Sequence, residues 1–184
     1  MDLEDDILFT AVQTGGGGFF RNVGGTRRQG VEAGVGGEWK RLRYFLSYAY
    51  VDATYQSDET LASVTEAEGV RVRPADRIPG IPLHNLKLGA ELAILKDLWI
   101  GADVIATSGS FLRGDDGNRR AKVDGYGLLN LHARYRPIRH VELWARVDNV
   151  TNADYETGGA LNFNAFGPSS GSSPPAHPSR AGPA

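Results

Sequence analysis

The sequence has 184 residues, a formal net charge of −2 and no cysteine. The charge argues against a nucleic-acid binder, which is usually markedly basic. The absence of cysteine excludes a disulfide framework, a thiolate metal site and a cysteine nucleophile. The mean hydropathy of −0.31 does not decide between water and membrane, because membrane-spanning strands place only one face against lipid. No apolar run reaches the roughly 18 residues of a transmembrane helix.

Apolar and polar residues alternate along most of the chain, which is the pattern of β-strands. In LKLGAELAIL, for example, Leu86 and Leu88 fall on one face and Lys87 on the other. No segment has helical periodicity. We expect about seven strands, with an eighth begun near Tyr155. In chain order, the seven cover residues 3–12, 28–39, 43–55, 86–95, 98–109, 125–135 and 141–148.

The connections between these strands alternate in length. Short turns are predicted at 40–41, 95–97 and 137–140, and long polar loops at 13–18, 57–82 and 113–125. Short turns on one side and long loops on the other are typical of an outer-membrane barrel. The expected strands are also long, whereas soluble strands average nearer 5 or 6 residues. Both features favour a transmembrane barrel over a soluble sandwich.

The polar faces of these strands carry charges in mid-strand, which suits a wet barrel lumen opposite a lipid-facing aliphatic face. Trp39, Tyr44 and Tyr135 lie near the short turns, where an interfacial aromatic girdle is expected. After the strand 141–148, Asn149, Asn152 and Asp154 favour a turn, because their side chains bond to nearby backbone groups.

Three motifs resemble TonB-dependent outer-membrane receptors, in the order and with the spacing of that family. They are NVGGTRRQGVEAGV (22–35), RPADRIPGIPLHNLKLG (73–89) and LWARVDNVTNADYETGG (143–159). They are similar to motifs of the last third of the family's barrel. The resemblance implies an all-β fold, here an antiparallel transmembrane β-barrel represented by its C-terminal part.

The resemblance further implies a 22-stranded barrel in the outer membrane of a Gram-negative bacterium, plugged by an N-terminal domain. Such receptors take up scarce nutrients, mostly ferric siderophores, with energy from the TonB complex. The plug, the TonB box and roughly the first fourteen strands have no counterpart in this sequence. The acidic start MDLEDDILF, which does not resemble a signal peptide, is therefore expected to be an internal position of a longer protein.

Two segments of the chain are expected to differ in kind. Residues 1–167 form the barrel part, and residues 168–184 form a disordered tail. The tail is rich in Pro, Ser and Gly, a composition that does not build strands. The family ends instead in an amphipathic strand with a terminal aromatic residue. We therefore interpret this tail as the product of a frameshift or a damaged reading frame, and the alternative is a genuine linker.

Arginines in the long loops are the candidate ligand-binding residues, because guanidinium pairs well with the carboxylate oxygens of an anionic ferric chelate. The plain alternative is that they are simply solvated. They are Arg71, Arg73, Arg77, Arg113, Arg119 and Arg120.

Other candidate sites fail on sequence grounds. His84, His132 and His140 each look isolated, so no metal site and no catalytic cluster is expected. The segment RGDDGNRR (113–120) lacks the length and terminal Glu of a calcium loop, and we interpret it as a solvated loop tip. No cofactor is expected.

The favoured function is therefore a monomeric, non-enzymatic part of an outer-membrane receptor for a ferric siderophore, in contact with lipid and with no nucleic-acid partner. Two alternatives remain open at this point. One is a small complete barrel of about eight strands that acts as an adhesin, a binding protein or an outer-membrane enzyme, and the other is a soluble β-sandwich binding module. The receptor interpretation predicts that the isolated chain aggregates in water and needs detergent.

Overall fold

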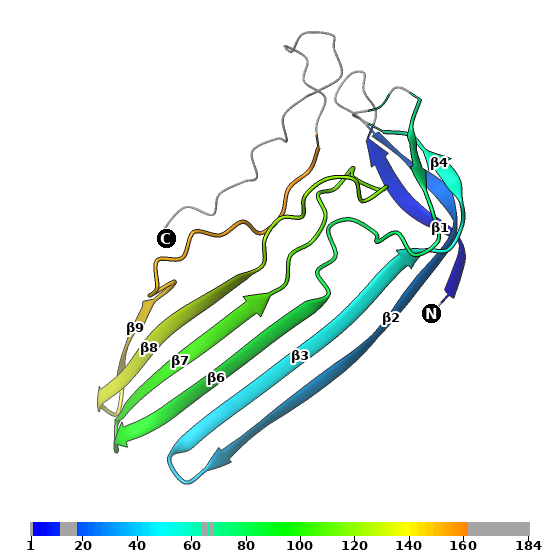
Figure 1. Ribbon diagram of the computed structural model, residues 1–184. Helices are drawn as coiled ribbons and strands as arrows, with labels where there is room; N and C mark the ends of the chain where they lie inside the picture. Colours follow the sequence, from blue (N-terminus) through cyan, green and yellow to red (C-terminus); the bar gives the residue numbers. More distant parts are fainter. Residues whose placement is uncertain (1, 12–17, 64–65, 67, 162–184) are drawn as a thin grey trace.

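The computed structural model describes residues 2–11, 18–63, 66 and 68–161. Seven antiparallel strands form one sheet in the order β1-β2-β3-β6-β7-β8-β9, and β4 and β5 form a separate hairpin (Figure 1). The strands are β1 (Asp2–Ala11), β2 (Gly18–Trp39), β3 (Leu42–Tyr55), β4 (Glu59–Leu61), β5 (Val70–Val72), β6 (His84–Leu95), β7 (Leu98–Thr107), β8 (Tyr126–Ile138) and β9 (Val141–Val147).

Each strand of the sheet pairs with the next sheet strand along the chain, so the sheet is a meander. Short turns at 40–41, 96–97 and 139–140 lie at one end, and the long connections 56–83 and 108–125 lie at the other (Figure 1). This confirms the predicted alternation of connections on the residues described. The predicted loop at 13–18 falls mostly on residues 12–17, which lie outside the described residues.

The strand β2 is the main departure in strand length, since it begins ten residues before the predicted start at Arg28. Its first half pairs with β1, from Gly18 opposite Ala11 to Arg27 opposite Asp2. Its second half pairs with β3. The stretch RNVGGTRR carries too few apolar residues to show alternation, so the partner strand and not the local pattern defines this half of β2.

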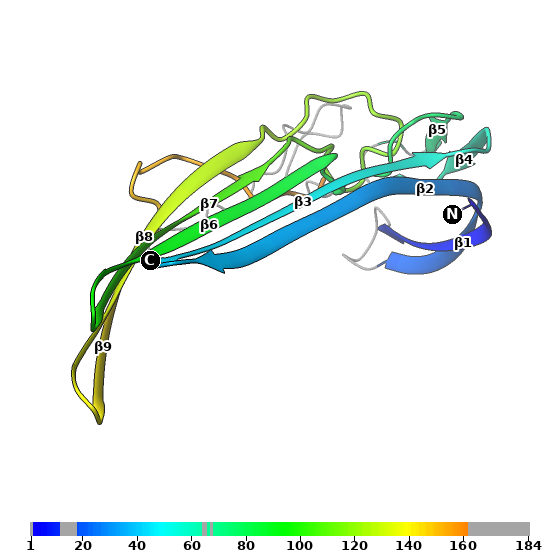
Figure 2. The ribbon, with the colours of Figure 1, turned by 90° about the horizontal axis from the view of Figure 1, so that it is seen from below.

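The pairing register collects the apolar residues of the sheet on one face, because directly opposite residues in an antiparallel pair point to the same side. Figure 2 shows that the sheet is a single curved layer. The exposed side chains on this face include large apolar ones, such as Val31 (64% exposed) and Leu143 (56%). One row runs across the sheet through Val35, Leu46, Leu88, Val104 and Leu129.

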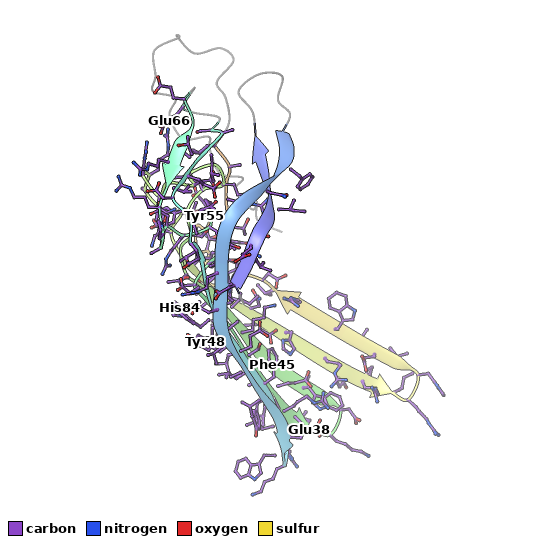
Figure 3. All side chains as sticks on the ribbon, turned by 90° about the vertical axis from the view of Figure 1, so that its right-hand side faces the viewer. Glu38, Phe45, Tyr48, Tyr55, Glu66 and His84 are labelled. Carbon is purple, nitrogen blue, oxygen red and sulfur yellow. The ribbon has the colours of Figure 1, made fainter. Side chains whose placement is uncertain are left out.

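The opposite face is polar and closely packed around small residues. Phe45 lies over Gly89 at the β3–β6 pair, and the His132 ring lies over Gly101 at the β7–β8 pair. A Cβ at Gly101 would overlap the His132 ring and crowd the Ala90 carbonyl oxygen, so only glycine fits there. Figure 3 shows Tyr48 and His84 on one side of the sheet and Phe45 on the other.

The larger buried cluster of the described residues lies at the end of the sheet that carries the long loops. It packs the β4–β5 hairpin and the segment after it against the ends of β2 and β3. We use "loop unit" for residues 56–83 and 108–125 together. This larger cluster consists of Val23, Ala53, Tyr55, Leu61, Val70, Val72 and Ile78.

The turn after β9 agrees with the sequence. Asn149 and Asn152 both have positive φ, 50° and 51°, a region that Asn tolerates better than most residues. The Asn149 side chain accepts a hydrogen bond from the Ala153 amide (2.9 Å) and donates one to the Ala153 carbonyl (3.0 Å). The Asn130 side chain accepts from the Asn149 amide (2.9 Å), which fixes the turn to β8.

The expected eighth strand near Tyr155 is wrong for residues 151–161, which contain no strand. The chain instead runs back toward the loop unit, where Ala160 forms an isolated parallel bridge with Arg113. Tyr155 packs against Tyr126 with ring centroids 5.0 Å apart. A side-chain contact, and not renewed strand pairing, therefore explains the lone aromatic.

Among the residues that the structure describes, no helix is long and apolar enough to cross a membrane. The tail predicted at 168–184 lies outside the described residues, as does the end of the barrel segment from residue 162.

Candidate functional site

The two long connections that carry the candidate arginines lie against each other. The Asn118 side-chain oxygen accepts from the Arg77 amide (2.7 Å), and its NH₂ group donates to the Arg77 carbonyl (2.9 Å). The Gly80 amide also donates to the Phe111 carbonyl (2.9 Å). All six arginines, which are distant in sequence, are therefore carried by one loop unit.

Three of these arginines already have acidic partners. Arg71 donates two hydrogen bonds of 2.6 Å to Asp58, and this pairing lowers the pKa of the Asp58 carboxyl. Arg119 contacts Glu66 at 3.0 Å, and Arg77 lies 3.8 Å from an oxygen of Asp52.

The Arg71 and Arg119 side chains are about half exposed. Exposed ion pairs of this kind contribute little to stability, about 0–1 kcal/mol each. Both guanidinium groups therefore remain within reach of solvent.

Arg73, Arg113 and Arg120 differ from the other three. In the described part of the chain, their guanidinium groups have no hydrogen bond and no ion pair within 4 Å. Their backbones are nevertheless held: the Arg73 amide donates to Asp76 (2.8 Å) and the Arg120 amide to Asp115 (2.9 Å). These three are the loop arginines best placed to meet an external anion.

The segment Asp115–Asn118 is not the solvated loop tip that the sequence suggested. Asp115 is 4% exposed, and its two oxygens accept from the amides of Arg119 and Arg120, each at 2.9 Å. Asn118 has a φ of 52°. Short polar side chains that cap nearby backbone amides make this loop compact. No group of three or more His, Cys, Asp or Glu side chains that could hold a metal ion occurs among the described residues.

Tyr55 is the residue that the sequence did not single out. It is fully buried at the end of β3, and its hydroxyl donates to Asp116 at 2.8 Å. Burial raises the pKa of the Tyr55 phenol, and the negative charge of Asp116 raises it further. A sequence signal for Tyr55 was nevertheless available. Tyr44, Tyr48 and Tyr50 fall on the apolar face of the alternating strand, whereas Tyr55, its last residue, falls on the opposite face.

A second cluster of charged residues lies on the polar face of the sheet. Arg43 pairs with Glu38 (2.7 Å) and Glu91 (3.4 Å), and Arg134 pairs with the same Glu91 oxygen (3.1 Å). His132 lies between Glu91 (3.6 Å) and Asp103 (3.3 Å).

The expectation that His132 is isolated is therefore wrong. The strand register brings together residues from β6, β7 and β8 that are more than ten positions apart in sequence. His84, at the start of β6, also has a partner, since its Nδ1 lies 2.8 Å from the Tyr48 hydroxyl.

A meander of long antiparallel strands, apolar and uncovered on one face and charged on the other, defines the wall of a transmembrane β-barrel. The family described as TonB dependent receptor-like, beta-barrel, matches residues 1–150. The chain belongs to this family, as its three motifs indicated. The family consists of receptors and transporters of the Gram-negative outer membrane and not of enzymes.

Solved structures with the same fold cover most of this chain. It is similar to the siderophore receptor PiuA from Acinetobacter baumannii (20% identity, TM-score 0.67, 86% of this chain and 22% of that one). It is also similar to the ferric-catecholate import receptor Fiu from E. coli K12 (20%, 0.60, 88% and 21%). A third is the copper transporter OprC (24%, 0.60, 88% and 23%). The chain spans about a fifth of the length of each.

Proposed function

We propose that this chain forms part of the barrel wall of an outer-membrane receptor that takes up a ferric siderophore. The observation that carries this proposal is the apolar face of the sheet, which no protein layer covers over the described residues (Figure 2). Soluble proteins rarely expose contiguous apolar patches of more than a few hundred Å². Lipid is the solvent that suits such a face.

The size of the apolar face supports this placement. On β6 its apolar residues run from Leu86 to Ile94, which at about 3.3 Å per residue and a strand tilt of about 40° spans about 20 Å along the barrel axis. This is close to the apolar band of roughly 25 Å on outer-membrane barrels. Trp39 and Tyr135 lie at the short-turn end of the face with 65% and 45% of their surfaces exposed, in agreement with a girdle at the periplasmic interface.

The ligand class rests on the loop arginines together with the family. PiuA and Fiu are described as a siderophore receptor and a ferric-catecholate receptor. An anionic ferric chelate suits the guanidinium groups of Arg73, Arg113 and Arg120, because guanidinium binds carboxylate and similar oxygens in a fork geometry. We assign this chain a binding and transport role with no catalysis, a monomeric state, and a link to the TonB complex only through the N-terminal part that the family resemblance implies.

Deletion of the gene that encodes this chain in its native host tests the proposal. Uptake of radioactive iron is measured from a panel of ferric siderophores under iron limitation, with copper uptake as a parallel measurement. We expect the deletion to abolish uptake of at least one ferric siderophore and to leave copper uptake unchanged. In the parent strain, we expect the chain in the outer-membrane fraction. Unchanged iron uptake with reduced copper uptake, or recovery in the soluble fraction, contradicts the proposal.

A further inference from the structure

The segment Asp115–Asn118 contacts the end of β3, the first long loop and its own loop through three different side chains. Asp116 accepts a hydrogen bond from the Tyr55 hydroxyl. Asn118 bonds both backbone groups of Arg77. Asp115 bonds the amides of Arg119 and Arg120. We call this segment, together with Tyr55, the latch.

The contacts of the latch are of the kind that hold a loop in one position. The Tyr55 ring is fully buried in the core that packs the β4–β5 hairpin, so its hydroxyl has no water to replace Asp116. A buried donor that loses its partner is costly, and a hydrogen bond to a charged acceptor is among the stronger ones. The contact with Arg77 engages both its amide and its carbonyl, as a pairing strand would.

The contacts of Asp116 and Asn118 join parts of the molecule that are distant in sequence, whereas Asp115 bonds within its own loop. The Tyr55 to Asp116 contact spans 61 positions and the Asn118 to Arg77 contact 41. The second long loop therefore cannot move away from both β3 and the first long loop without breaking both contacts. The backbones of Arg77, Arg119 and Arg120 are all fixed by the same few side chains, so the relative positions of these arginines depend on the latch.

We propose that the latch joins the two long loops into one rigid unit and sets the positions of Arg77, Arg119 and Arg120 on it. Tyr55, Asp115, Asp116 and Asn118 are positioning residues, and none is required to touch a ligand. The ligand role of the arginines rests on the proposed function. The rigidity of the unit does not, and it is measured without any ligand.

The absence of cysteine from the chain permits a direct test. Thr60→Cys on β4 and Ala121→Cys on the second loop, both at exposed positions, carry a pair of spin labels on the full chain in detergent micelles. Double electron–electron resonance then reports the distribution of distances between the two loops. We expect a narrow distribution in this background, and a shift to longer distances with broadening after Tyr55→Phe or Asn118→Gly.

The choice of variants separates the latch from other effects. Glycine at 118 keeps access to the positive φ and removes only the side chain. Asn118→Asp restores the acceptor for the Arg77 amide but not the donor, so its distribution should be intermediate. Asp124→Asn removes an exposed carboxylate from the same loop and should change nothing. A second label pair, at Ala90 and Ala145 in the sheet, reports whether the fold persists.

Two results would overturn the proposal. One is a broad distribution between the loops before any latch residue is changed. The other is a narrow, unshifted distribution in both Tyr55→Phe and Asn118→Gly while the sheet pair stays narrow. If Asn118→Gly also disturbs the sheet pair, Tyr55→Phe, which removes a single oxygen atom, decides the outcome. If Tyr55→Phe or Asn118→Gly abolishes siderophore uptake while the distances between the two loops stay unchanged, the result counts against the latch and not against the receptor function.

Discussion

The sheet and the loop unit place their apolar residues in opposite ways. On the sheet, Val31, Leu143 and Val147 are each more than half exposed, whereas in the loop unit Leu61 and Val72 are almost completely buried. The two regions are therefore built for different surroundings, one for lipid and one for water. An average such as mean hydropathy hides this difference, because the two regions contribute to it with similar residue types.

The largest expected effect is the local unfolding of the loop unit, without unfolding of the sheet. Tyr55→Ala removes the largest fully buried side chain among the described residues and should destabilise the loop unit by about 3–5 kcal/mol, as for other buried aromatic residues. Hydrogen exchange of the chain in detergent micelles should show faster exchange across 56–83 and 108–125. Exchange in β6 and β7 should stay unchanged, and a uniform rise across the sheet would mean that the two regions are one cooperative unit.

The next largest effect is a loss of stability that is confined to the sheet. Leu88→Arg places a charge in the middle of the apolar face, and we expect it to destabilise the bilayer-inserted state by about 2–4 kcal/mol. Denaturant titration in lipid vesicles measures this loss. The matched control is Ser47→Arg, on the neighbouring strand but on the polar face, where the cost should be near zero. Equal effects of the two substitutions would contradict the assignment of the faces.

A smaller effect is expected at the turn after β9. Asn149→Ala removes the side-chain bonds to Ala153 and introduces a residue that disfavours the positive φ, at a cost of about 1–2 kcal/mol. Asn149→Gly keeps access to this φ and should cost less. Local hydrogen exchange at 147–153 distinguishes the two. A larger cost for glycine than for alanine would show that the conformation is not the limiting factor.

The smallest effect is expected from the exposed pair of Asp58 and Arg71. Because Arg71 lowers the pKa of the Asp58 carboxyl below its ordinary value of 3.8, the pair contributes stability above that pH and loses it as the pH falls through the folded-state pKa. Arg71→Ala should remove this acid dependence and change little at neutral pH. Hydrogen exchange of the β4–β5 hairpin between pH 7 and pH 3 measures it, and an unaltered acid dependence in the variant would contradict the assignment to this pair.

The sequence predicted the sheet well for a physical reason. Alternation along a strand and the length of a turn are local properties, and Val31, Leu88 and Val147 each show their face within a few residues. The turn at Asn149 was equally local. The family resemblance was equally local, since each of its three motifs is a short contiguous stretch of sequence.

The contacts of the candidate site could not be predicted in the same way. Whether His132 meets a carboxylate depends on the register of β7 against β8, and whether Tyr55 is buried depends on how a loop 61 positions away folds back. The pairing of Arg71 and Arg119 with acids is likewise a property of the folded loops. The charge of these arginines and the loops that carry them could be predicted from the sequence, but their acidic partners could not.

The meander topology has a consequence for how this chain folds. The entropic cost of closing a loop grows with its length, by about 0.6 kcal/mol for each doubling, so the three hairpins with short turns should form before the two joins through 56–83 and 108–125. The order in which the strands meet is thus set by the connections. The core of the loop unit packs the ends of β2 and β3 against the segment that leads into β6. The loop unit should therefore hold the preformed hairpins together as one sheet.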